Sequence, residues 1–129
     1  VDYSKMPYCI YSFPEAGSIG ISEETAKEDH IDFKVAKFPF MANGKAMICG
    51  ETEGMVKILY DDTLGEILGV HIVGEHATEL IANFSTALNG ELTIDELAST
   101  LMAHPTLSEA MAEAAQAALG QALHLPKGR

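Results

Sequence analysis

The sequence has no tryptophan, only two cysteines and few basic side chains among its 129 residues. Eight lysines and arginines stand against nineteen aspartates and glutamates, so the formal net charge at pH 7 is -11. A chain this acidic repels phosphate backbones and anionic lipid surfaces, so we expect neither nucleic acid nor membranes as partners. No apolar run approaches the roughly 20 residues that a membrane-spanning helix needs.

The usual motifs for binding nucleotides or metals are also missing. The sequence has no GxGxxG, no GxxxxGKS/T, no HExxH, no paired-cysteine zinc spacing and no GxSxG. Cys9 and Cys49 lie forty positions apart in apolar stretches, which predicts two small buried side chains and leaves a disulfide open. His71 and His76 bracket a turn and make a poor metal site. We therefore expect no metal and no cofactor site of the chain's own.

Length and composition favour a single folded domain over residues 1–129. Hydrophobic residues make up 47% of the chain, and a domain of this size hides roughly two-thirds of its unfolded surface. No signal-peptide pattern opens the sequence. Because the first residue is Val1 rather than Met, we expect a fragment of a longer protein, whose other part would hold any targeting signal.

Alternating apolar and polar residues predict strands, and apolar residues at helical spacing predict helices that follow them. Strands are expected at residues 7–13, 32–40, 54–60 and 67–73, with a turn or bulged segment at 16–20, a bulge near Ala36 and a loop at 41–53. Helices are expected at residues 23–29, 76–88, 93–101 and 107–119, followed by a frayed tail at 121–129. This order indicates an α+β fold, an antiparallel sheet of about five strands with helices packed on one face.

His104 and Glu109 are the residues whose placement suggests chemistry. Pro105 favours extended backbone at His104, so the ring projects from just outside a helix whose predicted N-cap is Thr106. A carboxylate beside the imidazole would orient the ring and stabilise its protonated form, which suits acid–base catalysis near neutral pH. The same spacing is also that of an ordinary capping box, in which Glu109 accepts a backbone N–H. Spacing alone leaves both interpretations open and favours the capping box.

The run Ala103-His104-Pro105-Thr106-Leu107-Ser108-Glu109 closely resembles the signature of the pyridine-nucleotide disulfide oxidoreductases. Other segments resemble the carboxy-terminal dimerisation domain of that family, in the same order along nearly the whole chain. Residues 8–15 and 19–24 look like its opening strand and turn, 42–47 like its central loop, 54–58 and 67–74 like its hairpin, and 79–81 like the next helix. Within the family, residues 43–47 and 104–109 look most like the dihydrolipoamide dehydrogenase branch.

The resemblance implies a homodimer in which this domain supplies an acid–base pair to the partner subunit's flavin site. His104 would take a proton from a dihydrolipoyl thiol, and Glu109 would orient the ring. The backbone at His104 and Pro105 would lie near the partner's FAD, and NAD would be the second cofactor. Lipoyl domains of 2-oxo acid dehydrogenase complexes or of the glycine cleavage system would be partners. The expected compartment is the cytoplasm of a bacterium, or the mitochondrial matrix of a eukaryote.

The sequence departs from the family pattern in two ways. Met102 stands where many dihydrolipoamide dehydrogenases have a second histidine. The FAD domain, the NAD domain and the redox-active CxxxxC pair are absent from this chain, so the isolated domain is expected to be inactive. The alternatives are the interface domain of a glutathione-reductase-like or mercuric-reductase-like enzyme, and a dimerisation module without a catalytic role.

Overall fold

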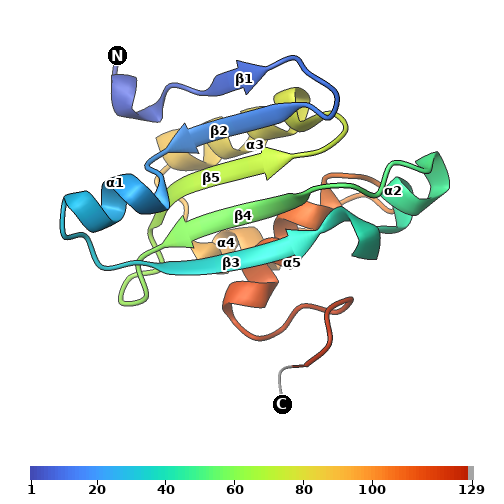
Figure 1. The fold of residues 1–129 in the computed structure, drawn as a ribbon. Coiled ribbons are helices and arrows are strands. Elements are labelled where there is room, and N and C mark those ends of the chain that lie inside the picture. The colour runs from blue at the N-terminus through green and yellow to red at the C-terminus, as the bar shows by residue number, and fades with distance from the viewer. Residues whose placement is uncertain (128–129) are drawn as a thin grey trace.

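The alternating segments of the sequence form one antiparallel sheet in a computed structural model, which describes residues 1–127 (Figure 1). The strands are β1 (Tyr8–Ile10), β2 (Ala16–Gly20), β3 (Lys34–Pro39), β4 (Met55–Tyr60) and β5 (Ile67–Val73). Their order across the sheet is β1-β2-β5-β4-β3. The helices are α1 (Glu23–Glu28), α2 (Gly44–Cys49), α3 (Ala77–Asn89), α4 (Ile94–Ser99) and α5 (Glu109–Ala118), with 3-10 turns at Tyr3–Lys5 and Phe40–Ala42. The predicted α+β class and five-stranded antiparallel sheet are confirmed.

The hairpin of β4 and β5 forms the middle of the sheet. Val56 pairs with Ile72 and Ile58 with Val70, and all four side chains are fully buried on one face. A slip of one residue would turn these β-branched side chains toward solvent, so their burial fixes the register of the hairpin.

Helices cover this apolar face and lie behind the sheet in Figure 1. α3 packs against β2 and β5, whereas α5 packs against β3 and β4 and has α4 beside it. The stripe that predicted α3 is buried as expected, with Leu80, Ile81, Phe84 and Leu88 facing the core. α5 instead buries small side chains, which let a helix lie close to its neighbours. These are Ala110, Ala112, Ala114 and Ala115.

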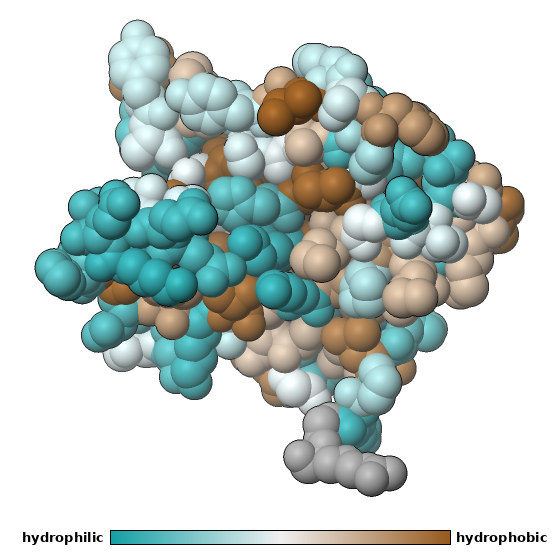
Figure 2. Space-filling view, in the orientation of Figure 1, coloured by the Kyte–Doolittle hydropathy of each residue, from teal (hydrophilic) through white to brown (hydrophobic). Residues whose placement is uncertain are grey.

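The other face of the sheet carries polar side chains. Lys57 of β4 donates to Glu23 of α1 over 3.0 Å between Nζ and Oε1, and this bond lowers the pKa of Glu23. His71 Nε2 of β5 lies 3.1 Å from the carbonyl oxygen of Ile21, which precedes α1. The region of α1, on the left in Figures 1 and 2, is strongly hydrophilic.

Three details differ from the sequence-based predictions. Residues 16–20, expected as a turn or bulge, form β2 because their backbone pairs with both β1 and β5. Residues 41–53, expected as a loop, contain α2, because the Asn43 side chain caps a helix there by accepting the Ala46 N–H. The register irregularity lies between Leu59 and Tyr60 of β4, whereas Ala36 pairs regularly with Ile58.

The cysteines and the tail also differ in part. Cys9 is half-buried but Cys49 is exposed, so the prediction of two buried thiols is wrong for Cys49; both thiols are free. The tail, expected to be frayed, is fixed to α5 by bonds from Leu123 and His124, while residues 128–129 lie outside the described residues. Within residues 1–127, no helix combines the length and apolar character needed to cross a membrane.

Candidate functional site

His104 lies in the loop between α4 and α5, just before the helix start that the sequence predicted. Its peptide bond to Pro105 is cis. The loop is closed at its base by Thr106, whose Oγ1 donates to the carbonyl oxygen of Ala103 over 2.7 Å. The side chain of His104 is 74% exposed, so its ring is presented to solvent on a short, defined loop.

Glu109, the first residue of α5, reaches back to this loop with both carboxylate oxygens. Its Oε1 lies 2.8 Å from His104 Nδ1, and its Oε2 accepts the Thr106 N–H over 2.9 Å. The structure therefore brings the two predicted site residues together. The predicted N-cap is wrong, because the residue before α5 is Ser108 and the Thr106 hydroxyl bonds to Ala103 instead of to the helix.

The charge of Glu109 decides which ring nitrogen of His104 can accept a proton. Burial raises the pKa of Glu109, but the bonds from Thr106 and His104 and the positive charges of His104 and His124 outweigh burial, so the pKa is lowered. The carboxylate is ionised at neutral pH and can only accept hydrogen bonds, so Nδ1 carries a proton. In the neutral ring, Nε2 then keeps its lone pair and can accept a proton. The pair has the arrangement of a carboxylate-oriented general base.

Asn43 connects α2 to the loop of His104. Its side chain is almost fully buried, with the residue only 3% exposed. Its Oδ1 accepts the Ala46 N–H over 2.9 Å, which caps α2, and its Nδ2 donates to the carbonyl oxygen of Thr106 over 3.0 Å. From the sequence, Asn43 was expected only as part of the loop at 41–53, and its contact with the site was not predicted.

A second histidine–glutamate pair lies next to the first and was also missed. Glu113 of α5 accepts a hydrogen bond from Nδ1 of His124 in the tail, and both residues line a cavity of about 90 Å³ together with His104 and Glu109. The remaining lining residues are Phe38, Ala42, Asn43, Gly44 and Met47. One signal in the sequence pointed this way: Glu113 follows Glu109 by four residues, which places both on one side of a helix.

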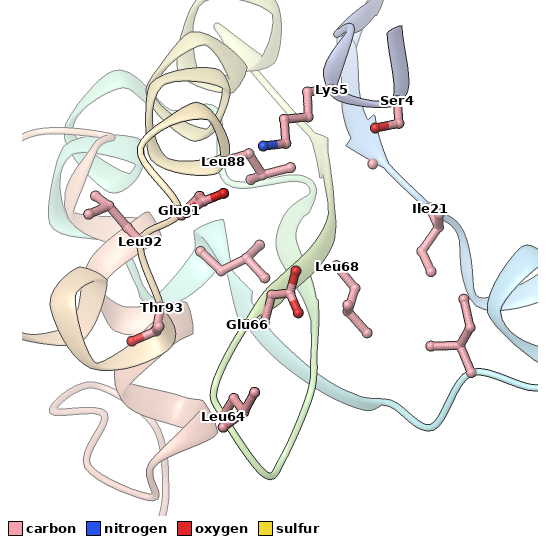
Figure 3. A pocket seen from close by; sticks show the side chains of 13 residues that line it. Ser4, Lys5, Ile21, Leu64, Glu66, Leu68, Leu88, Glu91, Leu92 and Thr93 are labelled. Atoms are coloured by element: carbon pink, nitrogen blue, oxygen red, sulfur yellow. The ribbon is translucent and has the colours of Figure 1, made fainter. Parts of the chain in front are cut away.

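A larger cavity of about 560 Å³ lies away from His104, between the first 3-10 turn, β5 and the end of α3 (Figure 3). Its lining is mainly apolar, with Lys5, Glu66 and Glu91 as the charged side chains. No histidine or cysteine from the described part of the chain lines it. The lining that the structure describes therefore lacks the side-chain types that ordinarily titrate near neutral pH.

The chain is similar to proteins of known activity over almost its whole length. The model of the pyridine nucleotide-disulphide oxidoreductase dimerisation domain matches residues 6–115. The chain is 48% identical over 124 residues to a dihydrolipoyl dehydrogenase from Bacillus subtilis, covering 96% of this chain and 26% of that protein. It is 44% identical to the mitochondrial dihydrolipoyl dehydrogenase 2 of Arabidopsis thaliana, covering 97% and 25%. The chain thus spans about a quarter of the length of these relatives.

Solved structures share the fold. LpdA from Mycobacterium tuberculosis superposes with a TM-score of 0.84 at 26% identity, over 90% of this chain and 25% of that one. The HOCl-induced flavoprotein disulfide reductase RclA from Escherichia coli has a TM-score of 0.83 at 24% identity, over 88% of this chain and 26% of that one. At that identity, the second likeness concerns the fold alone.

Proposed function

This chain belongs to the dimerisation-domain family of the pyridine nucleotide-disulphide oxidoreductases, and we propose that it is the carboxy-terminal interface domain of a dihydrolipoamide dehydrogenase. In that enzyme it would form the homodimer and supply His104 and Glu109 for the oxidation of dihydrolipoyl groups. The observation that carries this proposal is the 2.8 Å bond between His104 Nδ1 and Glu109 Oε1, which leaves Nε2 free on an exposed ring.

The proposed chemistry of this domain is the movement of one proton. A dihydrolipoyl thiol that reaches His104 gives its proton to Nε2, which leaves a thiolate as the nucleophile for disulfide exchange and an imidazolium on the protein. Glu109 stabilises that imidazolium through Nδ1 and keeps the ring in one orientation. Because Glu109 is itself held by the Thr106 N–H, the ring does not have to be reoriented when its charge changes.

The cofactors of the proposed enzyme would be held mainly outside this chain. FAD and NAD, when bound in the rest of the enzyme, would take up the electrons released by the dithiol. The sequence has no glycine-rich loop between a strand and a helix, so its residues do not fit a nucleotide cradle. His104 and Pro105 are exposed, and we propose that their backbone lies against the partner subunit's flavin. The isolated chain should accordingly show no flavin absorbance after purification in the presence of FAD.

A second copy of the chain and lipoyl domains are the proposed partners. Contiguous exposed apolar patches mark interaction surfaces, and we propose that exposed large apolar side chains in and around β1 and α2 belong to the surface that the partner covers. They include Tyr8, Ile10, Tyr11 and Phe13 in and after β1, and Met41, Met47 and Ile48 in and before α2. The proposed compartment is the cytoplasm for a bacterial protein and the mitochondrial matrix for a eukaryotic one, since relatives of both kinds match the chain.

The test of this function uses a full-length enzyme in which this domain replaces that of the Bacillus subtilis relative. His104→Gln keeps a polar side chain but removes the base. We expect turnover of dihydrolipoamide with NAD to fall by about 10²–10⁴-fold, the usual contribution of a general acid–base group, while flavin content stays unchanged. Glu109→Gln should cause a smaller loss, because the base remains but its orienting charge is gone.

The matched control is His30→Gln, which changes an exposed histidine in the turn after α1. It should leave turnover at the unmutated level. A His104→Gln enzyme that turns over near that level would rule out the catalytic role and would favour a dimerisation module without chemistry. Turnover of glutathione disulfide in place of dihydrolipoamide would instead point to a glutathione-reductase-like enzyme.

A further inference from the structure

Glu113 is a buried carboxylate that the proposed proton transfer does not use. Its side chain is 8% exposed, although it lies only one helical turn after Glu109 on the same side of α5. Taking a carboxylate out of water is costly unless hydrogen bonds replace the lost solvation. The partners of Glu113 therefore indicate what the residue is for.

Within residues 1–127, Glu113 accepts its hydrogen bonds from the tail of the chain. Its Oε2 accepts the N–H groups of Leu123 over 3.0 Å and of His124 over 3.4 Å, and its Oε1 accepts a hydrogen bond from His124 Nδ1. Hydrogen bonds to an ionised acceptor are about twice as strong as neutral ones. One side chain of α5 thus holds the tail by two backbone groups and one ring.

The chain is turned back toward Glu113 by the end of α5. Gly120 has a φ of +69°, which redirects the backbone after the helix, and the Gln121 N–H donates to the carbonyl oxygen of Gln116 over 2.8 Å. Further along, Leu125 packs against the core. The tail consequently returns along the helix, and His124 reaches the cavity that His104 and Glu109 also line.

The two histidine–glutamate pairs share that cavity. The titratable side chains that line it are His104, Glu109, Glu113 and His124, with Asn43 as the other polar lining side chain. A protonated His124 adds a positive charge near Glu109, and this charge is one of those that lower the pKa of Glu109. When His124 is protonated, the tail therefore places a positive charge near the carboxylate that bonds to His104.

We propose that Glu113 and His124 form a latch that holds the tail against α5 and keeps His124 at the cavity of His104 and Glu109, and that His124 is a positioning residue acting on Glu109. The effect of the latch on catalysis rests on the proposed function, in which His104 and Glu109 are the acid–base pair. Its tests use the folded 129-residue chain without turnover, so failure of the latch and failure of the proposed activity are distinguishable.

The first test is Glu113→Gln, which keeps the shape of the side chain but removes its charge. Amide exchange at Leu123 and His124 should become about tenfold faster or more, because charge-assisted bonds hold these groups. The matched control is Glu79→Gln at an exposed position of α3, which should leave that exchange unchanged. Unchanged exchange in Glu113→Gln would overturn the latch and would mean that the packing of Leu125 and the Gln121 N–H bond hold the tail without Glu113.

The second test is His124→Gln, which keeps the backbone N–H groups bonded to Glu113 but removes the ring and its charge. The pKa of Glu109, followed by carbon NMR of its carboxyl group, should rise toward its usual range. If His124 only anchored the tail, the pKa of Glu109 would stay the same in His124→Gln as long as the amides of residues 123 and 124 remain protected from exchange. Protected amides with an unchanged Glu109 titration would overturn the positioning role of His124.

Discussion

The side chain of Asn43 gives a quantitative test of how α2 supports the loop of His104. Asn43→Ala removes two bonds at once, the cap on the Ala46 N–H and the tether to the Thr106 carbonyl. Loss of an N-cap costs about 1 kcal/mol, and loss of a typical hydrogen bond about another 1 kcal/mol. We therefore expect Asn43→Ala to lower the free energy of unfolding by about 2 kcal/mol.

Asn43→Ser separates these two contributions. The serine hydroxyl can still accept the Ala46 N–H, but it is too short to donate to Thr106, so the expected loss is about 1 kcal/mol. Ser22→Ala serves as a control, because Ser22 caps α1 through Thr25 and has no contact with the site. Ser22→Ala should also lower the free energy of unfolding by about 1 kcal/mol, and this loss comes from the missing N-cap alone.

Urea unfolding followed by circular dichroism measures these differences, with about 1 kcal/mol corresponding to a shift of roughly 0.5–1 M in the midpoint. The proton shared by His104 and Glu109, followed by NMR, reports on the loop itself. It should broaden in Asn43→Ser and stay sharp in Ser22→Ala. If Asn43→Ser unfolds at the unmutated midpoint with a sharp His104 signal, Asn43 is only a helix cap and the tether to Thr106 has no role.

Three further predictions concern the core, the backbone and acid pH. Phe84→Ala should lower the free energy of unfolding by about 3–5 kcal/mol in urea titrations, because a fully buried ring leaves a cavity. Gly54→Ala should cost more than about 2 kcal/mol, since φ is +101° and the added Cβ would lie 1.8 Å from the Val73 carbonyl oxygen; Gly44→Ala, which meets nothing within 4 Å, should be neutral or stabilising. The pKa of Glu109 is lowered from its usual value of 4.5, so its contribution to stability is present above that pH and is lost on acidification through its lower folded value. The urea concentration at the unfolding midpoint should decrease as the pH is lowered below 4.5, and this decrease should be smaller in Glu109→Gln.

The sheet and the long helix could be predicted from the sequence because their signals are local. Residues 54–60 and 67–73 carry apolar side chains that pack on one face, and residues 76–88 place theirs on one stripe. Each signal is a periodic pattern of apolar residues within one short segment, so it can be recognised without knowing which distant residues the segment contacts. Residues 16–20 were misjudged because two glycines weaken strand propensity, and only pairing with β1 and β5 makes them a strand.

The surroundings of His104 could not be predicted, because they depend on contacts between distant residues. Asn43 followed by Gly44 suits a turn as well as an N-cap, and the contact that ties it to the site lies 63 residues further on at Thr106. Glu113 and His124 are closer in sequence, but they meet only because the backbone turns back at Gly120. Neither contact has a periodic pattern that would reveal it.

The two interpretations of Glu109 that the spacing left open are both present in one carboxylate. Oε2 accepts the Thr106 N–H, as a capping glutamate does, while Oε1 bonds to His104. Fixing one oxygen on the backbone leaves the other in a set direction, so the helix start determines where the ring of His104 is held. A carboxylate without that backbone bond would have to give up side-chain rotamer freedom each time it met the imidazole. The capping geometry is thus a precondition of the proposed acid–base pair, and the spacing that made the function doubtful is the spacing that the function needs.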